Sequence, residues 1–148
     1  MRSILVPIDF SEVTEQVVDR ATQLAKAFSS KVCLLHVAAP DPAFVGWDPG
    51  PDIVRHERAT SLRDEHRRAQ EIAESLRAAG IDAQALLVQG PTVETILDRA
   101  AKEDADVIIL GSHGHGALYR ALLGSVSEGV LRGSRCPVLI VPTANKAA

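Results

Sequence analysis

Residues 106–130 read DVIILGSHGHGALYRALLGSVSEGV and contain the strongest indication of the fold. It begins with a short, uninterrupted apolar run, which is typical of a strand buried on both faces of a parallel sheet. A glycine-rich segment follows this run directly, and the Ser125-x-x-Glu128 pattern then matches a capping box at the start of a helix. The stretch therefore predicts a strand, a loop and a short helix that begins at Ser125.

Other apolar runs predict the rest of the sheet. The five expected strands are Ile4 to Ile8, Lys31 to Val37, Ala83 to Val88, Asp106 to Leu110 and Pro137 to Val141. Helical periodicity between these runs predicts a helix over Ser11 to Phe28, a long one from Asp52 with a stop signal at Gly80, and a third with Pro91 in its first turn. Strands that alternate with helices indicate an α/β fold, an open doubly wound parallel sheet with helices on both faces.

Composition limits what the chain can be. Its 148 residues suit a single domain over 1–148, with a flexible tail over 143–148. Hydrophobic residues make up 46% of the chain and aromatic residues only 3%, so the core must consist mainly of Val, Ile, Leu and Ala. The formal net charge of -3 gives no general attraction to nucleic acid or to an anionic membrane, and neither is an expected partner.

The sequence also indicates the compartment. The N-terminal MRSILVPIDF is interrupted by Pro7 and Asp9, unlike a signal peptide, and no apolar run has the length of a membrane span. Cys33 and Cys136 have no framework of spacings around them, which indicates reduced structural thiols. A cytoplasmic protein without membrane insertion is expected.

A segment rich in Pro and Gly, Ala38 to Asp52, is expected to form a long loop at the carboxyl end of the sheet. It carries the only tryptophan of the chain. Two interpretations have equal support, a lid over a ligand site and a solvated connection.

The glycines after the fourth strand suit the binding of an anion. At Gly111 and Gly114 the missing side chains let main-chain N–H groups approach a ligand. Gly124 and Ser125 open the next helix, whose free N–H groups and positive dipole end favour an anion, and Ser125 and Ser127 add hydroxyl groups. A phosphate chain could thus be held without a lysine. The alternative is ordinary turn chemistry, with Ser125 capping only its own helix.

The sequence resembles the universal stress protein family. The pattern Gly111-x-x-Gly114, nine residues, Gly124-Ser125 looks like the nucleotide-binding signature of that family. Further similar segments follow the family's order along the chain: ILVPIDFSE, LLHV, GPTVETIL, ADVIILGSHG and CPVLIV. Only the segment from Ala39 to about Arg68 looks individual.

The resemblance implies a Rossmann-like, five-stranded parallel sheet in the order 3-2-1-4-5, with ATP, accompanied by Mg²⁺, in the crevice between strands one and four. Its implied contacts fall into two groups. Pro7, Ile8, Asp9 and Val37 would line the adenine and ribose end, and Gly111, Ser112, His113, Gly114, Gly124, Ser125, Val126 and Ser127 would surround ribose and phosphates. Members of the family without the glycine signature do not hold ATP, whereas this chain keeps every signature position.

Several polar residues near these strands have more than one interpretation. Asp9 could coordinate Mg²⁺ on the phosphates, hydrogen-bond the nucleotide, or cap the turn beside Ser11, and a ligand contact is preferred. His113-x-His115 suggests a metal, but no third ligand stands at a defined spacing. His36, at the end of an apolar strand, is expected to be a hydrogen-bonded structural residue.

Catalysis has less support in the sequence than binding. The Walker pattern GxxxxGK[ST] is absent and no lysine lies between Lys102 and Lys146, although phosphoryl transfer relies on cations at the developing charge. Arg120 and a metal near Asp9 could together support a slow ATPase or an autophosphorylating enzyme, which is the rival hypothesis. A response-regulator receiver and a flavodoxin fit less well, because the acidic pair, the lysine and the hydroxyl-rich loop that they need are missing.

The last strand, Pro137 to Val141, is an uncharged, β-branched edge in the family's strand order, and an open edge of this kind invites aggregation. Antiparallel pairing with the same strand of a second copy, a dimer mode that the family implies, would cover it. The sequence thus predicts a homodimeric ATP-binding regulatory protein of the stress response, whose occupied cleft is read by an unidentified protein partner. A ligand-free dimeric scaffold is the third hypothesis.

Overall fold

The structure, a computed structural model, describes residues 1–40, 52–113 and 123–143. Five parallel strands form one sheet in the order β3-β2-β1-β4-β5, which confirms the expected order. The strands are β1 (Ser3–Ile8), β2 (Lys31–Ala38), β3 (Ala83–Gln89), β4 (Val107–Gly111) and β5 (Val138–Val141). Each predicted strand boundary lies within one residue of the observed one.

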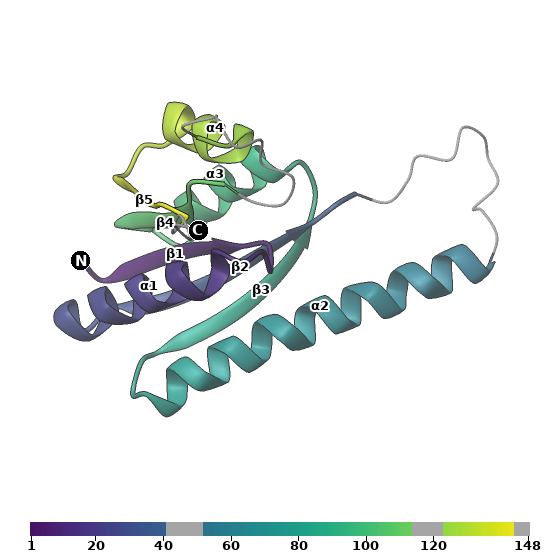
Figure 1. Cartoon of the computed structure of the whole chain (residues 1–148), viewed down its shortest axis with the longest axis horizontal. Helices are drawn as coiled ribbons and strands as arrows, with labels where there is room; N and C mark the ends of the chain where they lie inside the picture. Colours follow the sequence, from purple (N-terminus) through teal and green to yellow (C-terminus); the bar gives the residue numbers. More distant parts are fainter. Residues whose placement is uncertain (41–51, 114–122, 144–148) are drawn as a thin grey trace, which may run out of the picture.

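Helices cover both faces of the sheet, as expected (Figure 1). On one face α1 (Thr14–Phe28) and α2 (Asp52–Ala78) enclose a buried aliphatic cluster, and on the other α3 (Thr92–Lys102) and α4 (Ser125–Gly133) enclose a second. The first turns of α2 extend beyond the sheet (Figure 1), and their side chains are mostly exposed. Within the described ranges, no helix is both long and apolar enough to cross a membrane.

The first helix begins at Thr14, three residues later than the predicted start at Ser11. The reason is a side-chain contact at the end of β1. Asp9 Oδ1 accepts the N–H of Ser11 at 3.0 Å and the hydroxyl of Thr14 at 3.5 Å. These bonds hold the chain in a turn before the helix, in the way that aspartate side chains compete with helical hydrogen bonds.

The helix α4 begins at Ser125 as predicted, but the predicted capping box is wrong. The N-cap is Gly124, and no side chain caps the helix. The carboxylate of Glu128 instead pairs with Arg132 one turn later, at 2.7 Å. The backbone N–H groups of the first turn are therefore not satisfied by their own side chains.

Two other predicted helix boundaries agree with the structure. The second helix ends at Ala78, and Gly80 follows with a φ of 84°, a conformation that favours glycine. The third helix begins at Thr92, within one residue of the prediction, since Pro91 was expected in the first turn and is the N-cap.

Glycines on α4 let it lie close against α3. A Cβ added at Gly129 would lie 2.9 Å from Cγ2 of Val93, and one added at Gly133 would lie 2.6 Å from Cδ1 of Leu97. Both contacts fall on the face of α4 that packs on α3. This close packing fixes where the first turn of α4 lies relative to the sheet.

Both cysteines are free, as predicted. Burial raises the pKa of the Cys33 thiol to about 11, so it stays protonated and inert at neutral pH. Cys136 is partly exposed beside Ser134, whose hydroxyl bonds the Cys136 carbonyl at 2.7 Å.

The sheet opens at its carboxyl end between β1 and β4. The pairing of β1 with β2 continues to Ile8 opposite His36, but the pairing of β1 with β4 stops at Leu5 opposite Ile108. Pro7, two residues beyond Leu5, has no N–H to donate, and proline in a central strand interrupts a ladder for this reason. The end of the sheet beyond this last β1–β4 pair, called the crevice below, lies where the strand order reverses, the usual place for a ligand in such sheets.

The first residues of the chain are fastened to the start of β4. The carboxylate of Asp106 accepts the N–H groups of both Arg2 and Ser3. These two hydrogen bonds hold the pKa of Asp106 below its ordinary range.

Replacing Gly111 should test how tightly β4 approaches α1. A Cβ at Gly111 would lie 2.5 Å from Cγ1 of Val13, a stiff side chain that is 4% exposed. We expect Gly111→Ala to lower the free energy of unfolding by about 1–3 kcal/mol, measured by urea denaturation. In the double variant with Val13→Ala, the loss of unfolding free energy should be about 1 kcal/mol smaller than the sum of the losses in the two single variants. Strict additivity would show that the two residues do not compete for space.

The Asp106 contacts should make stability depend on pH. Because the pKa is lowered in the fold, the carboxylate stabilises the protein above about pH 4, and this contribution is lost as the pH falls through the lowered pKa. We expect Asp106→Asn to lower the melting temperature at neutral pH, and the gap to wild type to close in acid. Asp19→Asn, at an exposed position of α1, is the control. A gap that stays constant with pH would contradict the assignment.

Candidate functional site

The crevice at the carboxyl end of the sheet has different side chains on its two faces. Pro7 and Val37 continue the alternation of Leu5 and Leu35, so they face the side of α3 and α4. Ile8 faces the other side and is 6% exposed, which leaves mainly its backbone near the crevice. The predicted contacts Pro7 and Val37 thus lie on one face and the side chain of Ile8 on the other.

An apolar wall borders the crevice on the side of α3 and α4. Val37 stands opposite Val88 in the β2–β3 register. Both are partly buried against the cluster on this face, together with Val93 of α3 and Val126 of α4. Val88 and Val93 were not among the residues predicted for the site. In the sequence, Val88 ends the third predicted strand and Val93 lies on the apolar face of the third predicted helix. Both patterns indicate packing in the core rather than contact with a ligand.

The first turn of α4 is joined to the end of β4 by two hydrogen bonds. The N–H of Gly124 donates to the carbonyl of Ser112 at 2.7 Å, and the hydroxyl of Ser127 donates to the carbonyl of Gly111 at 2.7 Å. The predicted donors Gly124 N–H and Ser127 O–H are therefore used within the protein. The N–H groups of Ser125, Val126 and Ser127 lie in the first turn, where no carbonyl stands four residues earlier in the helix. Ser125 itself is exposed.

Ser112 is a junction between three segments. It is 6% exposed, and its N–H donates to the carbonyl of Val141 at 2.8 Å. Its carbonyl accepts Gly124, and its hydroxyl accepts the N–H of Thr143 at 3.1 Å and lies 3.0 Å from Nδ1 of His113. Through these bonds Ser112 holds β4, β5 and α4 together. Its contact with a ligand stays a prediction.

Of the three roles open to Asp9, the structure shows the cap. Its Oδ1 binds Ser11 and Thr14, and the residue is half-buried directly after β1. The cap fixes the carboxylate at the edge of the crevice. The preferred ligand contact of Asp9 stays a prediction.

Some predicted site residues lie outside the described residues. These are Gly114, His115 and Arg120, together with the loop residues 41–51 and the tail 144–148. Across the ranges that are described, no group of three or more His, Cys, Asp or Glu side chains is arranged to hold a metal ion.

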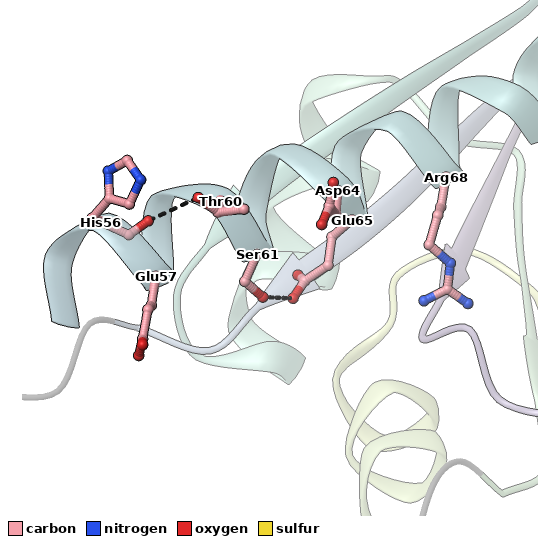
Figure 2. A pocket seen from close by; sticks show the side chains of 7 residues that line it. All are labelled: His56, Glu57, Thr60, Ser61, Asp64, Glu65 and Arg68. Carbon is pink, nitrogen blue, oxygen red and sulfur yellow. Dashed lines mark hydrogen bonds between the residues drawn. The ribbon is translucent and has the colours of Figure 1, made fainter. Parts of the chain in front are cut away.

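One side of α2 carries a separate group of polar side chains, most of them exposed, shown in Figure 2. A hollow of about 500 Å³ runs along this side, and its lining includes none of the residues predicted for the site. Its lining consists of His56, Glu57, Thr60, Ser61, Asp64, Glu65 and Arg68. At the inner end of this row His36 bonds both Ile8 and Glu65, which confirms the prediction that it is a hydrogen-bonded structural residue.

Comparison with known proteins gives consistent matches along the chain. The model of the universal stress protein family matches residues 1–142. A universal stress protein of Thermus aquaticus, encoded in the QAH/OAS sulfhydrylase 3′ region, is 34% identical over 143 residues, with 95% of this chain and 98% of the relative covered. Universal stress protein MJ0577 of Methanocaldococcus jannaschii is 31% identical over 156 residues, with 97% and 96% covered.

Solved structures agree in fold. The structure of MJ0577 superimposes with a TM-score of 0.83 at 32% identity, covering 98% of each chain. A universal stress protein solved in complex with cAMP gives a TM-score of 0.64 at 28% identity, with 95% of each chain covered. On the family match, the relatives and the shared fold, this chain belongs to the universal stress protein family.

Proposed function

We propose that the crevice between β1 and β4 binds an adenine nucleotide, ATP as the first candidate, and that occupancy regulates a homodimeric cytoplasmic protein of the stress response. The observation that carries the proposal is the placement of the first turn of α4. Two hydrogen bonds, from Gly124 and Ser127, hold this turn at the end of β4, with the N–H groups of residues 125–127 beyond the reach of intrahelical acceptors.

The phosphates would be held by the backbone rather than by a lysine. The N-terminal end of a helix carries roughly half a positive elementary charge, and its open N–H groups donate to phosphate oxygens. The hydroxyl of Ser125, exposed on this turn, would add one donor. His113, directly after Ser112, and Gly114 would border the same phosphates.

The nucleoside would lie against the apolar wall. Pro7, Val37 and Val126 present half-buried aliphatic surface on the face of α3 and α4, which suits the flat adenine ring. We extend this wall to Val88 and Val93. The relative solved with cAMP supports an adenine nucleotide as the ligand class.

Asp9 would contact the nucleotide or the Mg²⁺ that accompanies it. Carboxylate oxygens are ligands that Mg²⁺ prefers, and Mg²⁺ usually keeps several waters and binds through one or two protein carboxylates plus phosphates. A carboxylate held in place by Ser11 and Thr14 fits that mode of binding. The output of the protein is then a change in the cleft surface that a partner protein reads, not turnover of ATP.

A carboxylate placed at the start of α4 should separate binding from folding. We expect Ser125→Asp to keep or raise the melting temperature, since an acid suits a helix N-terminus, and to weaken ATP binding by about tenfold or more through repulsion of the phosphates. Isothermal titration calorimetry would measure the affinity, and phosphate release in the same samples would report any turnover.

The matched control is Gln23→Glu, which adds the same negative charge at an exposed position of α1, next to Arg20. It should bind ATP like wild type. Unchanged affinity in Ser125→Asp would remove the helix terminus from the site, and steady phosphate release by wild type would favour the enzyme hypothesis.

We also propose that β5 pairs with its copy in a homodimer. It has a strand neighbour only in β4 within the described sheet, and its side chains carry no charge. Leu139 is 39% exposed, a large apolar side chain on an open edge. Antiparallel pairing across a twofold axis would cover both the backbone groups and this side chain.

Leu139→Lys should test this pairing without entering the core, because Leu139 belongs to neither buried cluster, whereas Ile140 packs against one. A charge on the edge should give monomers in sedimentation velocity. Phe28→Lys, which makes the same change at a 54% exposed position at the end of α1, should leave the dimer intact. A stable dimer of the Leu139 variant would rule out this interface.

A further inference from the structure

His36 joins three elements at the carboxyl end of the sheet. It lies on β2 and is 9% exposed. Its Nδ1 is 2.9 Å from the carbonyl oxygen of Ile8, the last residue of β1, and its Nε2 is 2.8 Å from Oε2 of Glu65 on α2. A single imidazole ring thus bridges the end of the central strand and the long helix.

The partners of His36 fix the number of protons in the contact. A carbonyl oxygen only accepts, so Nδ1 must carry a hydrogen. With Nδ1 protonated, a neutral ring would present the lone pair of Nε2 to the carboxylate of Glu65 at 2.8 Å. The pair therefore requires one further proton between Nε2 and Oε2, whichever atom holds it.

Phe10 connects this pair to the turn that follows β1. Its ring centroid lies 4.7 Å from that of His36, and the guanidinium carbon of Arg68 lies 4.2 Å from the Phe10 centroid. In Figure 2, Arg68 points from α2 toward this turn. Phe10 has a φ of 59°, a left-handed conformation that costs energy in a bulky residue and persists only where its surroundings hold it. The residue before it is Asp9.

The charged and polar groups around His36 can be named for the part of the chain that the structure describes. Helix α2 contributes Glu65 and, over Phe10, Arg68. Strand β1 contributes a carbonyl, and β3 places Leu87 beside His36 in register. The other carboxylate oxygen of Glu65 accepts the hydroxyl of Ser61 at 3.0 Å, and Asp9 is bound to Ser11 and Thr14.

We infer that His36 and Glu65 form a proton-dependent clamp that fastens α2 to the end of β1 and positions the backbone of residues 8–10 at the nucleotide site. The clamp itself follows from the contacts above, and its effect on affinity rests on the proposed nucleotide site. His36 is a positioning residue in this scheme, because its ring lies on the face of the sheet opposite to the apolar wall.

The direction of the pH dependence follows from the proton count. Histidine side chains exchange this proton between about pH 5 and pH 8. With the extra proton the ring and the carboxylate share a hydrogen bond and the clamp is closed, whereas without it a lone pair of Nε2 faces an ionised carboxylate and the clamp opens. We therefore expect rising pH to loosen the first half of α2 and to weaken nucleotide binding.

Glu65→Gln keeps the contact with His36 but removes its need for an extra proton. Its amide can donate to a neutral Nε2 or accept from a protonated one, so the contact is kept without an extra proton. Glu65→Ala removes the contact at every pH. Glu57→Gln, an exposed carboxylate on the same face of α2, is the matched control.

The first measurement uses the protein without nucleotide. Hydrogen exchange of residues 52–68 would be compared between wild type and Glu65→Gln at the same pH, so that intrinsic exchange rates cancel. Wild type should be about fivefold less protected than the variant near pH 8 and equally protected near pH 6, a ratio at the lower end of coupling between sites. Equal protection at both pH values would overturn the clamp.

The second measurement is ATP affinity by calorimetry at the same two pH values. Because phosphate groups also titrate in this range, the relevant quantity is the ratio of affinities between variant and wild type. Glu65→Gln should bind about fivefold more tightly than wild type near pH 8 and equally near pH 6, with Glu57→Gln following wild type. A constant ratio would refute the coupling. If wild type bound no nucleotide at either pH, the proposed function would fail, while the exchange data would still decide the clamp.

Discussion

The position of the candidate site depends on the point where β1 and β4 stop pairing, after Leu5 and Ile108. A proline in the middle of a central strand lacks the N–H that would extend the ladder, so the two strands stop pairing while the sheet around them continues. The crevice that results lies at the reversal of strand order. The apolar wall lies on one face of the sheet there, and His36 lies on the opposite face.

The second constraint is the position of α4. Gly129 and Gly133 let it lie directly on α3, and the bonds from Gly124 and Ser127 join its first turn to β4. Side chains here serve to fix the backbone, and the amides of residues 125–127 lie in the first turn, where no carbonyl stands four residues earlier in the helix. A helix terminus held so firmly supplies a preorganised positive potential, and this explains how a phosphate site can work without a lysine.

The strands and the helices were predictable because each leaves a periodic apolar pattern that burial on two faces enforces. The late start of α1 was not, because the contacts of Asp9 with Ser11 and Thr14 compete locally with the helix. The predicted capping box was wrong because the carboxylate of Glu128 pairs with Arg132 one turn later. The Ser-x-x-Glu spacing alone does not take such a competing partner into account. The junction at Ser112 and the pair of His36 with Glu65 join residues about 30 positions apart, and such contacts are set by the folded sheet rather than by local sequence.

We propose that backbone amides at the start of α4 bind the phosphates of an adenine nucleotide. The most direct test is the amide chemical shifts of Ser125, Val126 and Ser127 in ¹⁵N-labelled protein titrated in parallel with ATP and with adenosine. We expect large shifts of these three amides with ATP and little change with adenosine, because only the phosphates would reach the helix terminus. Identical responses to both ligands, or none at these residues, would contradict it.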